Sequence, residues 1–129
     1  MPHPAAAVWE VVGDAGRIDE WFPGIVACEV ATADDGTVVR TVTLGTGLRL
    51  EEHVVTDDPL LRRFQYRIAG GIFREHLGTV DVIELDPDES LVVYSTDAEP
   101  AVMALVIGGA SGQALANLSE LVTTAPAAH

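Results

Sequence analysis

The chain has 129 residues, with 20 Asp and Glu against 7 Lys and Arg and a formal net charge of -13 at pH 7. Its length suits one domain, and a hydrophobic fraction of 48% is ample for a packed core. A strongly acidic chain repels phosphate backbones and anionic lipid headgroups, which argues against nucleic acid and membrane surfaces as partners.

The cysteine content and the first residues favour a reducing compartment. The single cysteine, Cys28, cannot close an internal disulfide. The start Met1-Pro2-His3-Pro4 lacks the basic and apolar regions of a signal peptide. The apolar stretch 101–110 is much shorter than the about 20 residues of a membrane-spanning helix. We therefore expect a cytoplasmic protein in which this stretch is a buried helix.

Two short helices are predicted at the beginning of the chain. Pro4 followed by Ala5-Ala6-Ala7-Val8-Trp9 is typical of a helix start, and Gly13 ends the apolar run. A second short helix is predicted through residues 18–22, because Pro23-Gly24 does not continue a helix.

From Ile25 onward the apolar residues recur with a period of two, and β-branched residues become frequent, which indicates strands. Asp34-Asp35-Gly36 is a strong hairpin signal between the first two strands. The pattern predicts six consecutive strands, over residues 25–33, 37–44, 48–56, 61–69, 73–85 and 91–98.

Beyond Pro100 the pattern predicts one long helix from Ala101, with an apolar stripe formed by Leu115, Leu118, Leu121 and Val122. Glycines 108, 109 and 112 weaken it, so we expect a kink or a close approach to the sheet there. This order of elements predicts an α+β domain in which a curved antiparallel sheet wraps the C-terminal helix and leaves a cavity between them.

Several short motifs carry a resemblance to a known family. They are Ala5-Ala6-Ala7-Val8-Trp9, Trp21-Phe22-Pro23, Arg40, Glu52 with Val54 and Asp58, and Tyr66 with Ile68. In this order they resemble the polyketide cyclase/dehydrase branch of the START-like (SRPBCC) superfamily, from about Pro4 to Val122. The resemblance implies the helix-grip fold and a pocket for a lipid, a polyketide or a similar amphipathic molecule, with no obligatory metal or nucleotide cofactor.

The sequence departs from this family at two places. Members usually begin with a strand, and here only Met1-Pro2-His3 precede the first helix. We expect either that a first strand is missing from the start, or that the sheet has an exposed edge that a partner chain covers, as in a homodimer. The second departure is His76, where similar sequences commonly have tyrosine.

Six residues are candidates for the pocket: Trp21, Phe22, Arg40, Glu52, Tyr66 and His76. Arg40 and Glu52 each lie on an otherwise apolar strand face, which indicates a buried pair. With Tyr66, such a pair could orient a ligand carbonyl or hydroxyl and, in a cyclase, polarise an enolisable ketone. The alternatives are a salt bridge that sets the strand register, or side chains that face solvent.

The two tryptophans and the His–Glu neighbours allow other interpretations. Trp9 is expected to anchor the first helix on the sheet, and Trp21 to border the pocket or simply to pack. His and carboxylate side chains can bind metals. However, neighbouring residues of a strand point to opposite faces, so Glu52-His53 and Glu75-His76 predict no metal site.

The leading hypothesis is therefore a module that binds a small hydrophobic or amphipathic molecule. A polyketide cyclase or dehydratase acting on a carbonyl substrate, through Arg40, Glu52, Tyr66 or His76, is the first alternative. An acidic regulatory or stress-response protein that binds a basic partner is the second.

Overall fold

The computed structural model describes residues 1–69, 75–99 and 101–124, with the side chains of 101–109 outside the description. Two short helices lead into six strands and a long helix. The elements are α1 (Ala5–Val12), the 3-10 helix η1 (Ala15–Glu20), β1 (Ile25–Thr32), β2 (Val38–Leu44), β3 (Arg49–Asp58), β4 (Arg63–Ala69), β5 (Glu75–Asp86), β6 (Glu89–Glu99) and α2 (Ala101–Thr124).

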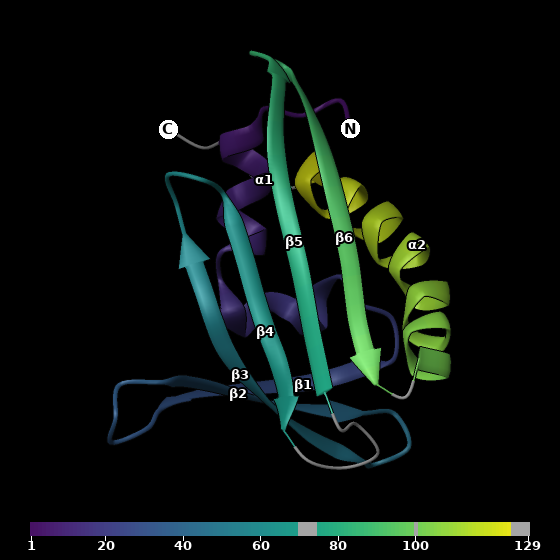
Figure 1. The fold of residues 1–129 in the computed structure, drawn as a ribbon. Coiled ribbons are helices and arrows are strands. Elements are labelled where there is room, and N and C mark those ends of the chain that lie inside the picture. Colours follow the sequence, from purple (N-terminus) through teal and green to yellow (C-terminus); the bar gives the residue numbers. More distant parts are fainter. Residues whose placement is uncertain (70–74, 100, 125–129) are drawn as a thin grey trace.

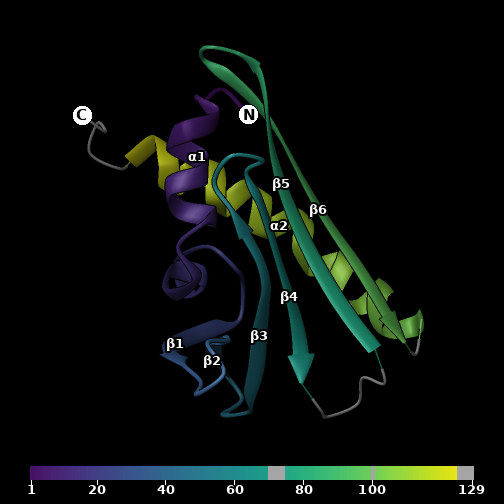
Figure 2. The same ribbon diagram turned by 60° about the vertical axis from the view of Figure 1, so that its left-hand side comes forward.

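The strands form one antiparallel sheet in the order β1-β2-β3-β4-β5-β6, so every strand pairs with its neighbours in the sequence. β3 to β6 run side by side while β1 and β2 turn across their lower end (Figure 1). The same view turned by 60° shows how strongly the sheet curves, with α1 and α2 beside one of its faces (Figure 2). This arrangement confirms the predicted α+β class, the six-stranded sheet and the C-terminal helix.

The strand bounds differ from the predicted ones by a few residues. β3 continues to Asp58, and β4 begins at Arg63, because residues 59–62 form the turn between them. The predicted start of the fifth strand at residues 73–74 lies outside the described residues. The second short helix is a 3-10 helix, and Trp21 caps its end instead of lying within it.

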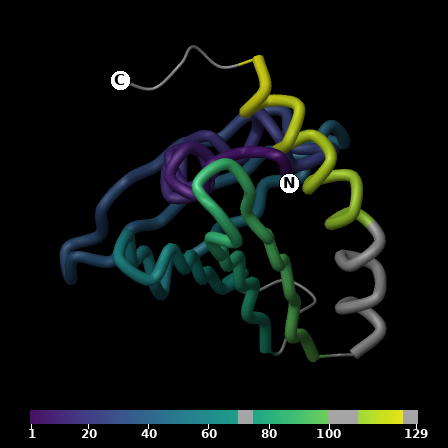
Figure 3. Tube along the Cα trace, turned by 90° about the horizontal axis from the view of Figure 1, so that it is seen from above, coloured from purple at the N-terminus to yellow at the C-terminus, as the bar shows by residue number. Residues whose placement is uncertain are grey.

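The core lies between the concave face of the sheet and the helices. α1 contributes Val8 and Val11, the sheet contributes Phe64 and Val80, and α2 contributes Leu118, all of them buried. Viewed from above, α2 runs along one side of the curved sheet (Figure 3). The predicted apolar stripe of this helix therefore faces the core: Leu118 is fully buried, and Leu115, Leu121 and Val122 pack against the cluster.

Of the two expectations for the helix glycines, the close approach to the sheet is wrong at Gly112, and the kink stays a prediction. A Cβ atom built there meets nothing within 4 Å, so no close approach to the sheet requires glycine at this position. Gly108 and Gly109 lie outside the residues whose side chains are described.

The first residues of the chain are tied to β6, the edge strand of the described sheet. The Met1 amino group donates to the Ser90 carbonyl at 2.9 Å, and the Ser90 N–H donates to the Met1 carbonyl at 3.0 Å. His3 reaches across to α2, where its Nε2 lies 3.0 Å from the Ser119 carbonyl oxygen. Beyond Ser90, no described segment pairs with the outer edge of β6. Pairing of this edge with a partner chain stays a prediction.

Gly78 in β5 lies directly beneath the ring of Tyr66 on the concave face. It pairs with Tyr66 of β4, and a Cβ atom built on it would lie 2.5 Å from Cζ of the Tyr66 ring. The glycine therefore makes the space in which the buried tyrosine ring lies.

We predict that Gly78→Ala lowers the free energy of unfolding by about 1–3 kcal/mol, because the added methyl group must displace a ring in a packed core. Gly112→Ala is the matched control. The same change in a helix interior with open space should raise stability by about 0.5–1 kcal/mol. Urea unfolding followed by circular dichroism measures both. Equal stability of Gly78→Ala and the unmodified chain would contradict the close packing of Tyr66 on this strand.

Candidate functional site

A buried ion pair joins two neighbouring strands on the concave face. Arg40 in β2 and Glu52 in β3 are directly opposite each other in the strand register. The Arg40 Nε lies 2.6 Å from Glu52 Oε1, and the two residues are 2% and 5% exposed. Arg40 also donates from Nη1 to the Ala15 carbonyl of η1 at 3.2 Å. The prediction that these two polar residues face inward is therefore correct.

Burial and mutual attraction have opposite effects on the pKa of each partner. Burial raises the pKa of Glu52, and the attraction of Arg40 opposes this shift. Burial acts to lower the pKa of Arg40, but the Glu52 carboxylate and the neighbouring Tyr66 outweigh it, so that pKa is raised. Because the guanidinium is always protonated in proteins, the carboxylate is its fixed counter-ion.

Tyr66 of β4 lies directly beside the ion pair. The guanidinium carbon of Arg40 is 4.7 Å from the centre of the Tyr66 ring and 5.2 Å from the Phe64 ring, which is a cation–π arrangement. The Tyr66 hydroxyl forms a hydrogen bond with the hydroxyl of Tyr94 in β6. Burial raises the pKa of Tyr66 well above its usual value and that of Tyr94 to about 12. Both hydroxyls are therefore protonated at neutral pH.

His76 of β5 extends this group of polar side chains. It is buried, and its ring centre is 5.4 Å from that of Tyr66. Its Nδ1 accepts a hydrogen bond from the Ile68 N–H at 3.1 Å. Burial, with a smaller effect of Arg67, lowers the pKa of His76 to about 4. The imidazole is thus neutral at pH 7 and too weakly basic to be an effective general base there.

The remaining candidates, Trp21 and Phe22, complete the cluster from the end of η1. The ring centres of Trp21 and Tyr94 are 6.1 Å apart, and those of Phe22 and Tyr94 are 5.9 Å apart. Trp21 is buried, whereas Phe22 is partly exposed. The structure therefore brings all six predicted residues into one continuous set of contacts on the concave side, although their part in ligand binding stays a prediction.

Tyr94 is the residue that the sequence interpretation missed. It lies on the same face of β6 as Val92 and Thr96, while Leu91 and Val93 point to the exposed outer face. Both faces of this strand contain apolar residues, so the alternation did not indicate which one turns inward.

The other polar candidates are placed apart from this cluster. His53 lies on the outer face of β3, with Nε2 2.6 Å from Glu51 Oε1, whereas His76 is on the inner face. In the described part of the chain, no three His, Cys, Asp or Glu side chains gather as a metal site requires. Cys28 is half-buried and its thiol lies 3.7 Å from the Ala15 carbonyl oxygen. Burial raises the pKa of this thiol, which keeps it protonated.

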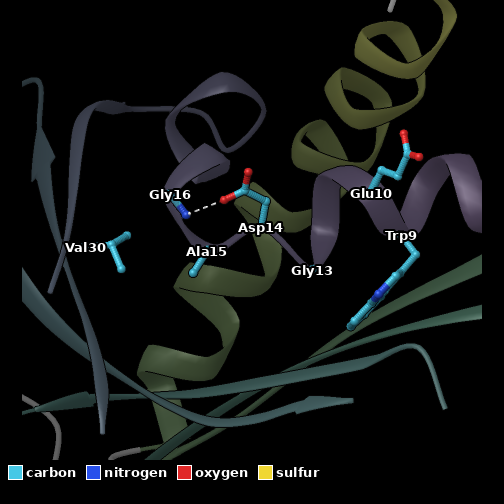
Figure 4. Close-up of a pocket in the computed structure, with 7 residues that line it drawn as sticks. All are labelled: Trp9, Glu10, Gly13, Asp14, Ala15, Gly16 and Val30. Atoms are coloured by element: carbon cyan, nitrogen blue, oxygen red, sulfur yellow. Dashed lines mark hydrogen bonds between the residues drawn. The ribbon is translucent and has the colours of Figure 1, made fainter. Parts of the chain in front are cut away.

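A surface groove of about 560 Å³ lies on another part of the molecule, between α1, η1 and β1. Its lining residues are Trp9, Glu10, Gly13, Asp14, Ala15, Gly16 and Val30. In Figure 4 the Trp9 ring and the Glu10 carboxylate point away from each other, and the Asp14 carboxylate accepts a hydrogen bond from the Gly16 N–H. The groove contains none of the predicted pocket residues. Its two carboxylates do not converge on a ligand position.

Comparison with known proteins identifies the family. The model of the family described as polyketide cyclase/dehydrase and lipid transport matches residues 1–123, so the chain belongs to this family. This confirms the resemblance drawn from the sequence motifs. No curated protein matches the chain. Among the described residues, no helix is both long enough and apolar enough to cross a membrane.

Solved structures show the same fold at low sequence identity. The chain is similar to the protein XoxI from Bacillus cereus, with 19% identity, a TM-score of 0.81 and coverage of 96% of this chain and 91% of that one. It is similar to the ZhuI aromatase/cyclase from Streptomyces sp. R1128, with 20% identity, a TM-score of 0.67 and coverage of 95% and 86%. It is also similar to norcoclaurine synthase from Thalictrum flavum, with 18% identity, a TM-score of 0.71 and coverage of 99% and 84%.

We predict that Glu52→Gln costs about 3–5 kcal/mol of stability, because it leaves the Arg40 charge buried without its counter-ion. The double variant Arg40→Met, Glu52→Leu should cost less than Glu52→Gln alone, since no charge remains in the core. Urea unfolding of the single and double variants measures this.

The exposed pair Arg63–Asp81, with 2.8 Å between Nε and Oδ1, is the control. Asp81→Asn should have a much smaller effect than Glu52→Gln, because solvent screens exposed charges. Similar losses in the two single variants would contradict the buried position of the Arg40–Glu52 pair.

We also predict that neutral His76 makes the protein less stable as the pH falls from about 6.5 to about 4. In this window the unfolded chain binds a proton at residue 76 that the folded chain does not, so acid favours unfolding by at most about 1.4 kcal/mol per pH unit. The free energy of unfolding of His76→Gln should therefore fall less steeply with decreasing pH. His53→Gln, on the outer face, should keep the steeper dependence. Identical slopes for His76→Gln and the unmodified chain would contradict the prediction.

Proposed function

We propose that this protein binds a small amphipathic molecule, such as a lipid or a polyketide, between the concave face of the sheet and α2. The observation that carries the proposal is a connected group of polar side chains on that face, in which Arg40, Glu52, Tyr66 and His76 are buried and Tyr94 is partly buried. Burying polar groups costs free energy unless they have partners. A few polar groups on an otherwise apolar face are what would orient a bound molecule.

Membership of the family supports the same proposal, because its description covers both polyketide cyclases and lipid transport. The structure of norcoclaurine synthase was solved in complex with dopamine and hydroxybenzaldehyde, so this fold can hold small aromatic molecules in that protein. Apolar side chains such as Val42, Val80 and Val82 would supply the hydrophobic contacts, and the polar cluster would orient the ligand.

A cyclase or dehydratase reaction is the second candidate. Its support is the Tyr66–Tyr94 hydroxyl pair beside the Arg40 guanidinium. A protonated hydroxyl that donates to a carbonyl oxygen would stabilise the charge that develops as a ketone enolises. Because the pKa of His76 is lowered to about 4, the proton acceptor in such a reaction would have to be another group, or the reaction would use a general acid only.

Ligand binding can be tested with a panel of aromatic ketones, naphthols and fatty acids of 8 to 12 carbons, by thermal shift and native mass spectrometry. We expect at least one class to stabilise the protein, by about 2.7 kcal/mol when its concentration is 100 times Kd. Tyr94→Phe should lower the affinity for a compound that has a polar group by roughly tenfold, because one buried hydrogen bond to the ligand is lost. Ser95→Ala, the next residue of β6 but on the exposed face, is the matched control and should leave the affinity unchanged.

If no compound stabilises the protein or is retained in native mass spectra, the proposed binding function is wrong. The compound recovered after incubation distinguishes the two candidate functions. A carrier releases the compound unchanged, whereas a cyclase or dehydratase releases a product of different mass or retention time.

A further inference from the structure

Trp21 is held in place between η1 and α2, which gives its indole ring a fixed direction. The backbone N–H of Trp21 donates to the Ile18 carbonyl at 3.3 Å. The backbone carbonyl of Trp21 accepts a hydrogen bond from Asn117 Nδ2 of α2 at 3.1 Å. The ring meets Phe22 and Tyr94 edge to face, and the residue is 3% exposed. Trp21 therefore belongs to the walls of the concave side and cannot turn its indole into solvent.

The indole Nε1–H of Trp21 is buried and has no hydrogen-bond partner among the described residues. This group is a donor only, and buried tryptophan N–H groups usually find an acceptor. Leaving a buried donor unpaired destabilises the folded protein. The faces of Phe22 and Tyr94 are at most weak acceptors and do not replace an oxygen atom. A molecule bound beside Trp21 would supply the missing acceptor.

A second buried group lies on the same face of the sheet. The hydroxyl of Thr96 in β6 has no partner among the described residues, and Thr96 pairs with Gly78, over which the Tyr66 ring lies. Thr96 is two residues from Tyr94, so both side chains point to the concave side. The residues next to Tyr94 thus provide two unpaired groups, one from Trp21 at the end of η1 and one from Thr96 in β6.

The charge of this cluster further restricts the chemical class of the ligand. Within the described part of the cluster, the one cation is Arg40, and Glu52 already neutralises it at 2.6 Å. The chain as a whole carries a net charge of -13. An anionic ligand would therefore meet no free positive charge here and a repulsive surrounding field.

From these observations we infer that Trp21 is a specificity-determining donor, and that the ligand is a small planar aromatic compound with an uncharged carbonyl or phenol oxygen. The Trp21 indole N–H donates to that oxygen, the Thr96 hydroxyl is available to a second polar group, and the rings of Phe22 and Tyr94 contact the aromatic body. Fatty-acid carboxylates and hydrocarbons are disfavoured. This inference rests on the proposed binding function.

The test uses three probes that share one ring system: 2-acetylnaphthalene, 2-ethylnaphthalene and 2-naphthoate. The chain has two tryptophans, so a ¹⁵N-labelled sample gives two indole N–H signals, which Trp9→Phe and Trp21→Phe assign. We expect the ketone to move the Trp21 indole proton downfield, as a new hydrogen bond does, while 2-ethylnaphthalene does not. The ketone should bind more tightly than 2-ethylnaphthalene and 2-naphthoate.

Trp21→Phe should weaken binding of the ketone by roughly tenfold and leave the affinity for 2-ethylnaphthalene nearly unchanged. Trp9→Phe is the matched control and should alter neither. Because the comparison of probes on the unmodified protein needs no variant, it decides the question even if Trp21→Phe does not fold.

Equal binding of the ketone and 2-ethylnaphthalene, with the Trp21 signal moved alike by both, would overturn the role of Trp21 and leave the binding function intact. A Trp21 proton that is already downfield without a probe and does not respond to the ketone would mean that a bound water is the acceptor, which also overturns the inference. Failure of all three probes and of the wider panel would overturn the binding function itself.

Discussion

The buried ion pair between Arg40 and Glu52 constrains how β2 and β3 pair. Arg40 and Glu52 lie opposite each other on β2 and β3, and side chains alternate between the two faces of a strand. A slip of one residue between these strands would turn one charge outward and leave the other alone in the core, at a cost of several kcal/mol. The pair therefore selects one register, and that register also turns Val42 and Val54 toward the helices.

With these charges paired, the other described polar side chains of the cluster are uncharged at pH 7. Burial keeps the hydroxyls of Tyr66 and Tyr94 protonated and the imidazole of His76 uncharged. The face thus offers hydrogen bonds and aromatic surface in place of net charge, although the chain as a whole is strongly acidic. Such a surface suits molecules with neutral oxygen atoms, because their binding requires no counter-ion and little desolvation of charge.

Because the identity to solved structures is low, the ligand of this protein has to be inferred from its own side chains. At 18–20% identity, the neighbours share the path of the backbone with this chain, and one fold can host many different functions. Under the proposed binding function, the groups that would select the ligand are the Trp21 indole N–H, the Thr96 hydroxyl and the tyrosine pair.

Local patterns in the sequence were sufficient to predict the fold and part of the site. Asp34-Asp35-Gly36 predicted the first hairpin, where Gly36 has a φ of 88° that glycine adopts readily. The isolated Arg40 and Glu52 on apolar faces predicted a buried pair. Both signals are short-range, since they depend on turn geometry and on the alternation of side chains along one strand.

Tyr94, Thr96 and the unpaired indole of Trp21 could not be found in this way. Both faces of β6 carry apolar residues, so only the packing of the helices decides that Tyr94 turns inward while Leu91 and Val93 stay exposed. The sequence by itself determined the order of elements, and it indicated that Arg40 and Glu52 form a buried pair. The tertiary structure alone decided which side chains from different strands meet, because curvature of the sheet and helix packing set those distances.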